Sequence, residues 1–178
     1  MKSSYKVALG GIVGALCLAL MFLTGIIPFG TYAFPCFAGI ILAILVIEVS
    51  YPVAFSVFFC VSALSFLITP DKEATLYFVL FFGYYPIVKS FIERVKSVIV
   101  QYLLKFLLFN LAMVAVFYIG LFVFSIPKES FNILDVYLPG VFLAFGNIFF
   151  FFYDLCVTRL VSLYIFKWHK IIKNKTKL

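Results

Sequence analysis

The side chains that could do chemistry in this chain are mostly charged groups placed inside apolar stretches. Lys105 and Asp154 interrupt two such stretches, and Arg159 follows Asp154 by five positions. A charge in the middle of a membrane span costs about 2.5–3.5 kcal/mol, so it faces other helices and needs a partner. At about 1.5 Å per residue, Lys105 lies about 10 Å from the start of its segment and Asp154 about 12 Å from the end of its segment. These two segment ends are expected on the same side of the membrane, so the two residues lie at similar depths. We therefore expect these two residues to form an ion pair, and Arg159 to extend to the lipid head groups.

Uncharged polar residues occur on the same two stretches. Asn110 lies at a depth similar to that of Asn147, which precedes Asp154 by seven positions, a step that returns to nearly the same side of a helix. Together with Gly140 and Thr158, Asn147 and Asp154 predict a stripe that faces the interior of a bundle. Two interpretations stay open, namely hydrogen bonds between helices and a polar wall under a ligand pocket.

The sequence contains no recognisable catalytic or metal-binding motif. Its four cysteines are far apart in or beside apolar segments, and its only histidine, His169, stands among C-terminal lysines. A phosphate-binding glycine loop, a nucleophile elbow and a paired-histidine motif are all missing. A membrane enzyme would need a carboxylate pair or a nucleophile near one face, whereas Glu48 and Asp154 are isolated in sequence. We therefore expect no enzymatic activity, no metal and no cofactor.

Composition sets the environment of these residues. Of 178 residues, 66% are hydrophobic and 12% charged, and the mean hydropathy is +1.21. Soluble domains have about 45–50% apolar and about 25% charged residues, so a globule of this size could not bury this much apolar surface. The apolar runs are continuous rather than alternating, which favours helices over a barrel. The sequence predicts an all-α, polytopic membrane protein.

Six apolar segments are long enough, or nearly so, to cross a membrane of about 30 Å. They are Val7–Ile27, Ala33–Val49, Tyr51–Thr69, Ala74–Val88, Val98–Phe124 and Tyr137–Phe166, and they form one six-helix bundle over residues 1–178. The fourth is short and carries Gly83 and Pro86, so we expect a bend or a shallow crossing there. The segment from Val88 to Tyr102 alternates apolar and polar residues at helical spacing, so we expect an amphipathic helix on the membrane surface, as a connector or a docking element.

The basic residues predict the orientation of the bundle. With both termini inside, ten Lys and Arg residues lie on the cytoplasmic side and only Lys72 and Lys128 lie outside. Positive residues are retained in the cytoplasm, so we expect a multi-pass protein of the cell membrane with N- and C-termini in the cytoplasm. The net charge of +7 then reflects topology and contact with membrane lipid, and we expect no nucleic-acid partner.

The first segment carries two stripes of small residues. Gly10, Gly14 and Cys17 form one stripe, and another lies on the opposite side, at Ala8, Gly11, Ala15 and Ala19. Small residues let backbones approach closely. One stripe should pack within the bundle, while the second is either buried there too or free to contact a partner helix.

These features resemble the S components of energy-coupling factor transporters, which capture vitamin-like micronutrients. The resemblance rests on chain size, six helices, internal termini and the sequence Ala15-Leu-Cys-Leu-Ala19. It implies that Gly11, Ala15 and Ala19 contact a transmembrane coupling subunit, which engages ATP-binding subunits. It also implies a small-molecule substrate bound from outside. By position, the substrate-binding candidates are Tyr32, Tyr77, Tyr118, Asn132, Asp135, Tyr137 and Asn147.

An alternative function is that of a structural or scaffold protein of the cell envelope. Small multi-span proteins of the rod-shape machinery resemble the same bundle. This alternative predicts contacts between helices and no ligand pocket.

Overall fold

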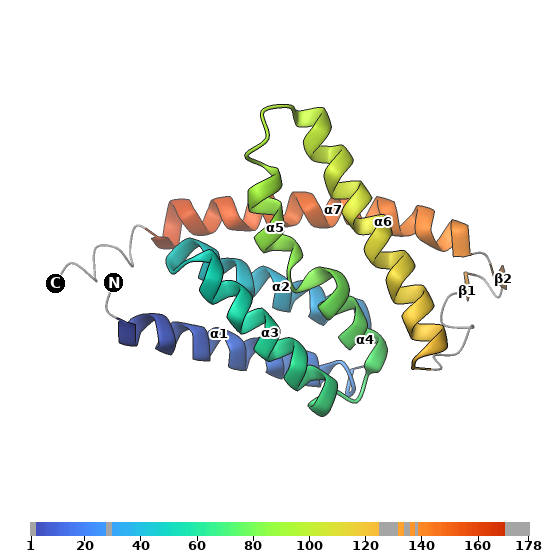
Figure 1. Cartoon of the computed structure of the whole chain (residues 1–178), viewed down its shortest axis with the longest axis horizontal. Helices are drawn as coiled ribbons and strands as arrows, with labels where there is room; N and C mark the ends of the chain where they lie inside the picture. The colour runs from blue at the N-terminus through green and yellow to red at the C-terminus, as the bar shows by residue number, and fades with distance from the viewer. Residues whose placement is uncertain (1–2, 28–29, 125–131, 134–135, 138, 170–178) are drawn as a thin grey trace.

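The computed structural model describes residues 3–27, 30–124, 132–133, 136–137 and 139–169, and it is almost entirely helical (Figure 1). The elements are α1 (Ser3–Leu23), α2 (Gly30–Glu48), α3 (Tyr51–Ile68), α4 (Lys72–Tyr77), the π-helix η1 (Phe78–Phe82), α5 (Tyr85–Ile92), α6 (Val98–Phe122), β1 (Asn132–Ile133), β2 (Val136–Tyr137), α7 (Pro139–Leu163) and the π-helix η3 (Tyr164–His169). The two short strands pair antiparallel.

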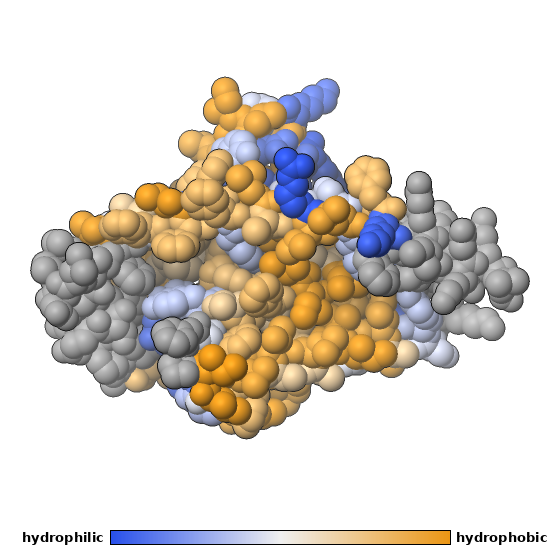
Figure 2. All heavy atoms as spheres, turned by 180° about the vertical axis from the view of Figure 1, so that it is seen from behind, coloured by the Kyte–Doolittle hydropathy of each residue, from blue (hydrophilic) through white to orange (hydrophobic). Residues whose placement is uncertain are grey.

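Six helical stretches among the described residues are long and apolar enough to span a membrane. Each corresponds to one of the six segments expected from the sequence, so the chain is a multi-pass, helical membrane protein. The fourth stretch, Lys72–Ile92, is longer than expected at both ends. Apolar side chains cover most of the molecular surface seen in Figure 2, as lipid contact requires. The first turn of α1 and the end of α7 lie at the same end of the bundle (Figure 1), as an even number of spans demands.

Three apolar clusters hold the described part of the bundle together, and the smallest lies between α4 and α6. The first joins α1, α2, α3 and the fourth span, and its fully buried members include Cys17, Leu42 and Phe78. The second is aromatic and lies between η1, α5, α6 and α7. In its centre the rings of Phe109 and Phe150 stack with centroids 4.7 Å apart. Flat rings supply large contact areas between helices that have no hydrophobic drive to associate in lipid.

The fourth span is interrupted near Gly83 and Pro86, where the sequence predicted a bend or a shallow crossing. The chain passes from α4 through η1 and a turn at Gly83 before α5 begins. Pro86 has no N–H, so it cannot donate the usual helical hydrogen bond to the Phe82 carbonyl four residues before it. That carbonyl lies against Gly39 of α2, where a Cβ would overlap it. Glycine at position 39 therefore lets α2 approach the break closely.

The expected amphipathic helix over Val88–Tyr102 is wrong. α5 ends at Ile92, a turn follows, and α6 starts at Val98. The side chain of Gln101 stabilises this turn by donating to the Val95 carbonyl at 2.7 Å. The expected polar face is also wrong at Lys89, which is buried inside the protein rather than on a solvated face.

The contact at Gly39 yields a stability prediction. Gly39→Ala should lower the free energy of unfolding by about 1–3 kcal/mol, because a backbone carbonyl cannot rotate away from the added methyl group. SDS titration of the protein in mixed micelles would measure this. Gly11→Ala is the matched control, since nothing lies within 4 Å of its Cβ position. Equal stability of the two variants would contradict the close contact.

Candidate functional site

Four charged side chains meet in an ionic cluster, which consists of Lys89 on α5, Glu93 in the turn after it, Lys105 on α6 and Asp154 on α7. Lys105 Nζ lies 3.1 Å from Asp154 Oδ2 and 2.8 Å from Glu93 Oε1. Lys89 Nζ contacts Asp154 Oδ1 and lies 2.9 Å from Glu93 Oε1. Two positive and two negative groups thus alternate, and the ionic cluster carries no net charge. It ties α5 to α6 and α7.

Three of the four residues in the ionic cluster are buried, and the fourth is partly exposed. Lys89, Lys105 and Asp154 are 3–4% exposed, whereas the side chain of Glu93 is 37% exposed. Tyr85 Oη donates to Asp154 Oδ1 at 2.6 Å, which satisfies a further lone pair of the carboxylate. A buried charge is tolerated only when it is paired and hydrogen-bonded, and this arrangement meets both conditions.

The ion pair between Lys105 and Asp154 was expected and is confirmed, but the sequence analysis missed the other members. Tyr85, Lys89 and Glu93 recur every four residues, so they share one helix face. That spacing could have indicated a shared buried face, but the sequence analysis assigned these charges to the solvated face of a surface helix. Arg159 lies outside the ionic cluster and is exposed, as expected for a side chain that reaches toward head groups.

A pair of asparagines links α6 to α7 deeper in the bundle. Asn110 Nδ2 donates to Asn147 Oδ1 at 2.8 Å, and Asn147 Nδ2 donates back at 3.0 Å. Both amides also donate to carbonyls of their own helices. The predicted interior stripe of α7 is correct for Asn147 and Asp154 but wrong for Gly140 and Thr158, which are exposed.

A second polar group gathers at the opposite end of the bundle, where α2 and α4 begin. This polar aromatic cluster consists of Thr31, Tyr32, Asp71, Glu73 and Tyr77. Thr31 Oγ1 donates to Asp71 Oδ2 at 2.8 Å, and Tyr32 Oη donates to Glu73 Oε1 at 3.1 Å. The rings of Tyr32 and Tyr77 meet edge to face at 5.0 Å. Asp71 also caps α4 through the Ala74 N–H.

Only two of the predicted substrate-binding residues, Tyr32 and Tyr77, come together among the residues whose side chains are described. Tyr118 is 55% exposed and stacks on Phe122 of its own helix, and Asn147 pairs with Asn110. Asn132 and Tyr137 face each other in the backbone pairing of β1 with β2. Asp135 lies outside the described residues. Asp71 and Glu73 were missed because they were counted only as loop charges.

The two small-residue stripes of α1 have different surroundings. Gly10 and Gly14 pack against Val57 of α3, each with a Cβ position 3.4 Å from a valine methyl group. Gly11, Ala15 and Ala19 are exposed, and the Cβ position of Gly11 meets nothing within 4 Å. Burial of this second stripe within the described part of the bundle is therefore excluded, and the stripe lies on an exposed face of α1 beside larger exposed side chains.

Comparisons with protein families, with curated proteins and with solved structures found no match to this chain. Within the part of the chain that the structure describes, no three His, Cys, Asp or Glu side chains gather to hold a metal ion. The resemblance to S components therefore remains a hypothesis based on the six spans and on the residues of α1.

The neutrality of the ionic cluster can be tested by removing charges singly and in pairs. Asp154→Asn should cost about 3–5 kcal/mol of unfolding free energy, because it leaves two buried lysines with one carboxylate. Adding Lys105→Gln restores neutrality, so the double variant should lose less than the sum of the single losses by about 1 kcal/mol or more. Arg159→Gln is the control and should stay within about 0.5 kcal/mol of the parent. Additive losses in SDS titration would refute the coupling.

Glu93 gives the ionic cluster a defined pH dependence. Burial alone would raise the pKa of Glu93, but hydrogen bonds from Lys105 and Lys89 outweigh it and hold the pKa below its ordinary value of 4.5. A lowered pKa in the folded state stabilises the protein above the ordinary value and ceases to do so as the pH falls through the lowered value. Thermal melts should therefore show Glu93→Gln less stable than the parent at pH 7, with the difference shrinking below pH 4.5. A difference independent of pH would contradict this.

Proposed function

We propose that this chain is a membrane subunit that binds a small organic, vitamin-like solute and works with a transmembrane coupling subunit, as S components of energy-coupling factor transporters do. The observation that carries the proposal is the exposed stripe of Gly11, Ala15 and Ala19. In this proposal the polar aromatic cluster faces outward and both termini lie in the cytoplasm.

The stripe suits a partner helix on physical grounds. Lipid chains pack against Leu and Ile as well as against small residues, so a membrane-facing helix gains nothing from small residues. A second helix gains from them, because the two backbones approach more closely and contact over a longer path. The opposite stripe of α1 already packs in this way against α3, with Gly10 and Gly14 at the contact.

The polar aromatic cluster supplies groups of the kind that bind small organic solutes. Tyr32 is 44% exposed, so its ring and hydroxyl are reachable, while Tyr77 is buried behind it. Small-molecule sites combine aromatic surface for contact with a few polar groups for orientation. Asp71 and Glu73 would favour solutes that carry hydrogen-bond donors or a positive charge.

A scaffold function in the cell envelope is the second candidate. The observation that favours it is that the polar groups of the polar aromatic cluster bond to each other, as in the pairs Thr31–Asp71 and Tyr32–Glu73. Such internal pairing serves a structural role without any ligand. The exposed stripe of α1 would then bind another envelope protein.

Mass spectrometry of the purified and denatured protein tests solute capture. We expect one recurrent solute to copurify with the parent, and Tyr32→Ala to reduce its amount about tenfold or more, which corresponds to about 1.4 kcal/mol of binding energy. Tyr102→Ala is the matched control, because Tyr102 is a tyrosine of similar exposure that contacts Lys105 of the ionic cluster instead.

Affinity purification from membranes tests the proposed contact between the stripe of α1 and a membrane partner. Ala15→Phe should remove the copurifying membrane partner and leave solute capture unchanged, whereas Leu111→Phe, at an exposed site on α6, should retain both. No solute together with a stoichiometric envelope partner would overturn solute capture in favour of the scaffold. Partner binding that tolerates Ala15→Phe would overturn the role of the stripe.

A further inference from the structure

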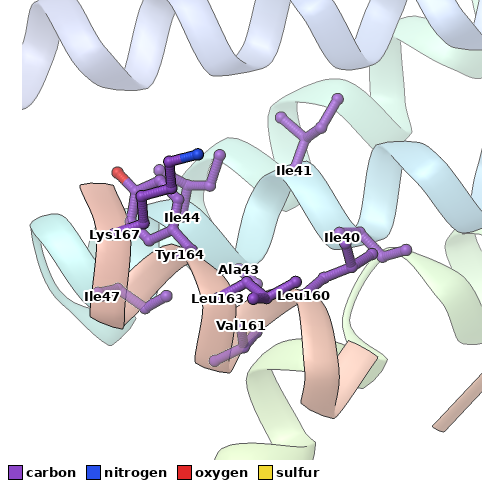
Figure 3. A pocket seen from close by; sticks show the side chains of 10 residues that line it. All are labelled: Ile40, Ile41, Ala43, Ile44, Ile47, Leu160, Val161, Leu163, Tyr164 and Lys167. Atoms are coloured by element: carbon purple, nitrogen blue, oxygen red, sulfur yellow. The ribbon is translucent and has the colours of Figure 1, made fainter. Parts of the chain in front are cut away.

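An apolar slot opens between α2 and the end of α7, with a volume of about 440 Å³ (Figure 3). Nine of its ten lining side chains are apolar or tyrosine, and the tenth is Lys167. The α2 wall is aliphatic and is formed by Ile40, Ile41, Ala43, Ile44 and Ile47. The facing wall consists of Leu160, Val161, Leu163, Tyr164 and Lys167. The volume lies within the range of about 300–1,000 Å³ typical of small-molecule sites.

The slot is bounded along the helices by contacts between α2 and the chain from α7 into η3. At one end, the Cβ position of Gly39 lies 3.4 Å from the hydroxyl of Tyr153. At the other end, Tyr164 Oη donates to Glu48 Oε1 at 3.1 Å. Nine residues separate Gly39 from Glu48, or about 13 Å at 1.5 Å per residue. This length is close to half of a hydrocarbon core of about 30 Å, the depth of one leaflet.

The shape selects among possible occupants. A transmembrane helix is about 10 Å wide and continues across both leaflets, so it cannot enter a slot that is closed after one leaflet. A single acyl chain is narrow, flexible and apolar, and it can enter sideways from the surrounding membrane. The aliphatic walls match its chemistry.

Charge selects the head group. Figure 3 shows Lys167 beside Tyr164, at the end of the slot away from Ile40, and the side chain of Lys167 is exposed. Lys167 lies in η3 and is the last residue of the sixth membrane-spanning stretch, so it is at the level where lipid phosphates lie. The carboxylate of Glu48 is nearby but accepts the hydrogen bond from Tyr164. An exposed ammonium group at this level favours an anionic head group.

We propose that the slot binds one acyl chain of an anionic phospholipid, with the phosphate of that lipid at Lys167. The site is independent of the proposed solute function, because none of its residues belongs to the polar aromatic cluster or to the stripe of α1. The bound lipid would fill the gap between α2 and α7 and belong to the folded structure.

Native mass spectrometry of delipidated protein tests the site. The probes are phosphatidylglycerol and phosphatidylcholine with identical acyl chains. We expect the first bound molecule of phosphatidylglycerol to bind about fivefold more tightly than the first bound molecule of phosphatidylcholine. This factor corresponds to the attraction of one lysine for an anionic lipid near a membrane surface. Lys167→Gln should abolish this preference. Lys96→Gln, at an exposed lysine outside the slot, should keep it.

Tryptophan substitutions that fill the slot test where the lipid binds. Val161→Trp should weaken binding of both lipids at least as much as Lys167→Gln weakens phosphatidylglycerol, and Ile44→Trp on the opposite wall serves if that variant does not fold. Equal affinity of the parent for the two lipids, or equal effects of Lys167→Gln and Lys96→Gln, would overturn the anionic site. Unchanged lipid binding in a folded tryptophan variant would overturn the location.

Discussion

A charged side chain inside the hydrocarbon region needs a side chain of opposite charge beside it. This constraint determines how α5, α6 and α7 pack together. Lys89, Lys105 and Asp154 are buried where water cannot hydrate them, and together with Glu93 they sum to zero charge. Each could be placed in the membrane only because the others are there. The ionic cluster therefore specifies how α5 sits against α6 and α7, rather than simply adding stability.

The broken fourth span depends on that arrangement. Helices with a π-turn and a proline expose backbone carbonyls, which lipid cannot satisfy, so such a break is tolerated inside protein. The stretch from Lys72 to Ile92 has the largest buried share of the six spans. α2 covers it at Gly39, and the ionic cluster anchors its far end. The polar aromatic cluster anchors its beginning, so both ends of the broken span are held by polar contacts.

Hydropathy alone was sufficient to predict the six spans, because the lipid requirement acts on composition over about 20 residues. Depth along a helix predicted that Lys105 meets Asp154, since both share one unfavourable environment. The partners on α5 were missed because a stretch that alternates charged and apolar residues suits a membrane surface and a buried bundle face equally well. Tyr118 shows the related limit for site residues, because position in a loop or span does not determine which way a side chain points.

Solid-state NMR of the protein in lipid bilayers tests the central claim most directly. Labelled lysine Nζ atoms should include two ammonium groups that are protected from hydrogen exchange, as expected for Lys89 and Lys105. Both should show dipolar contacts to the carboxylate carbon of Asp154, which follow from the 3.1 Å approach of Lys105 Nζ to Asp154 Oδ2 and the contact of Lys89 with Oδ1. Lysines that all exchange as fast as solvent-exposed groups, or an Asp154 side chain without a lysine contact, would contradict the account.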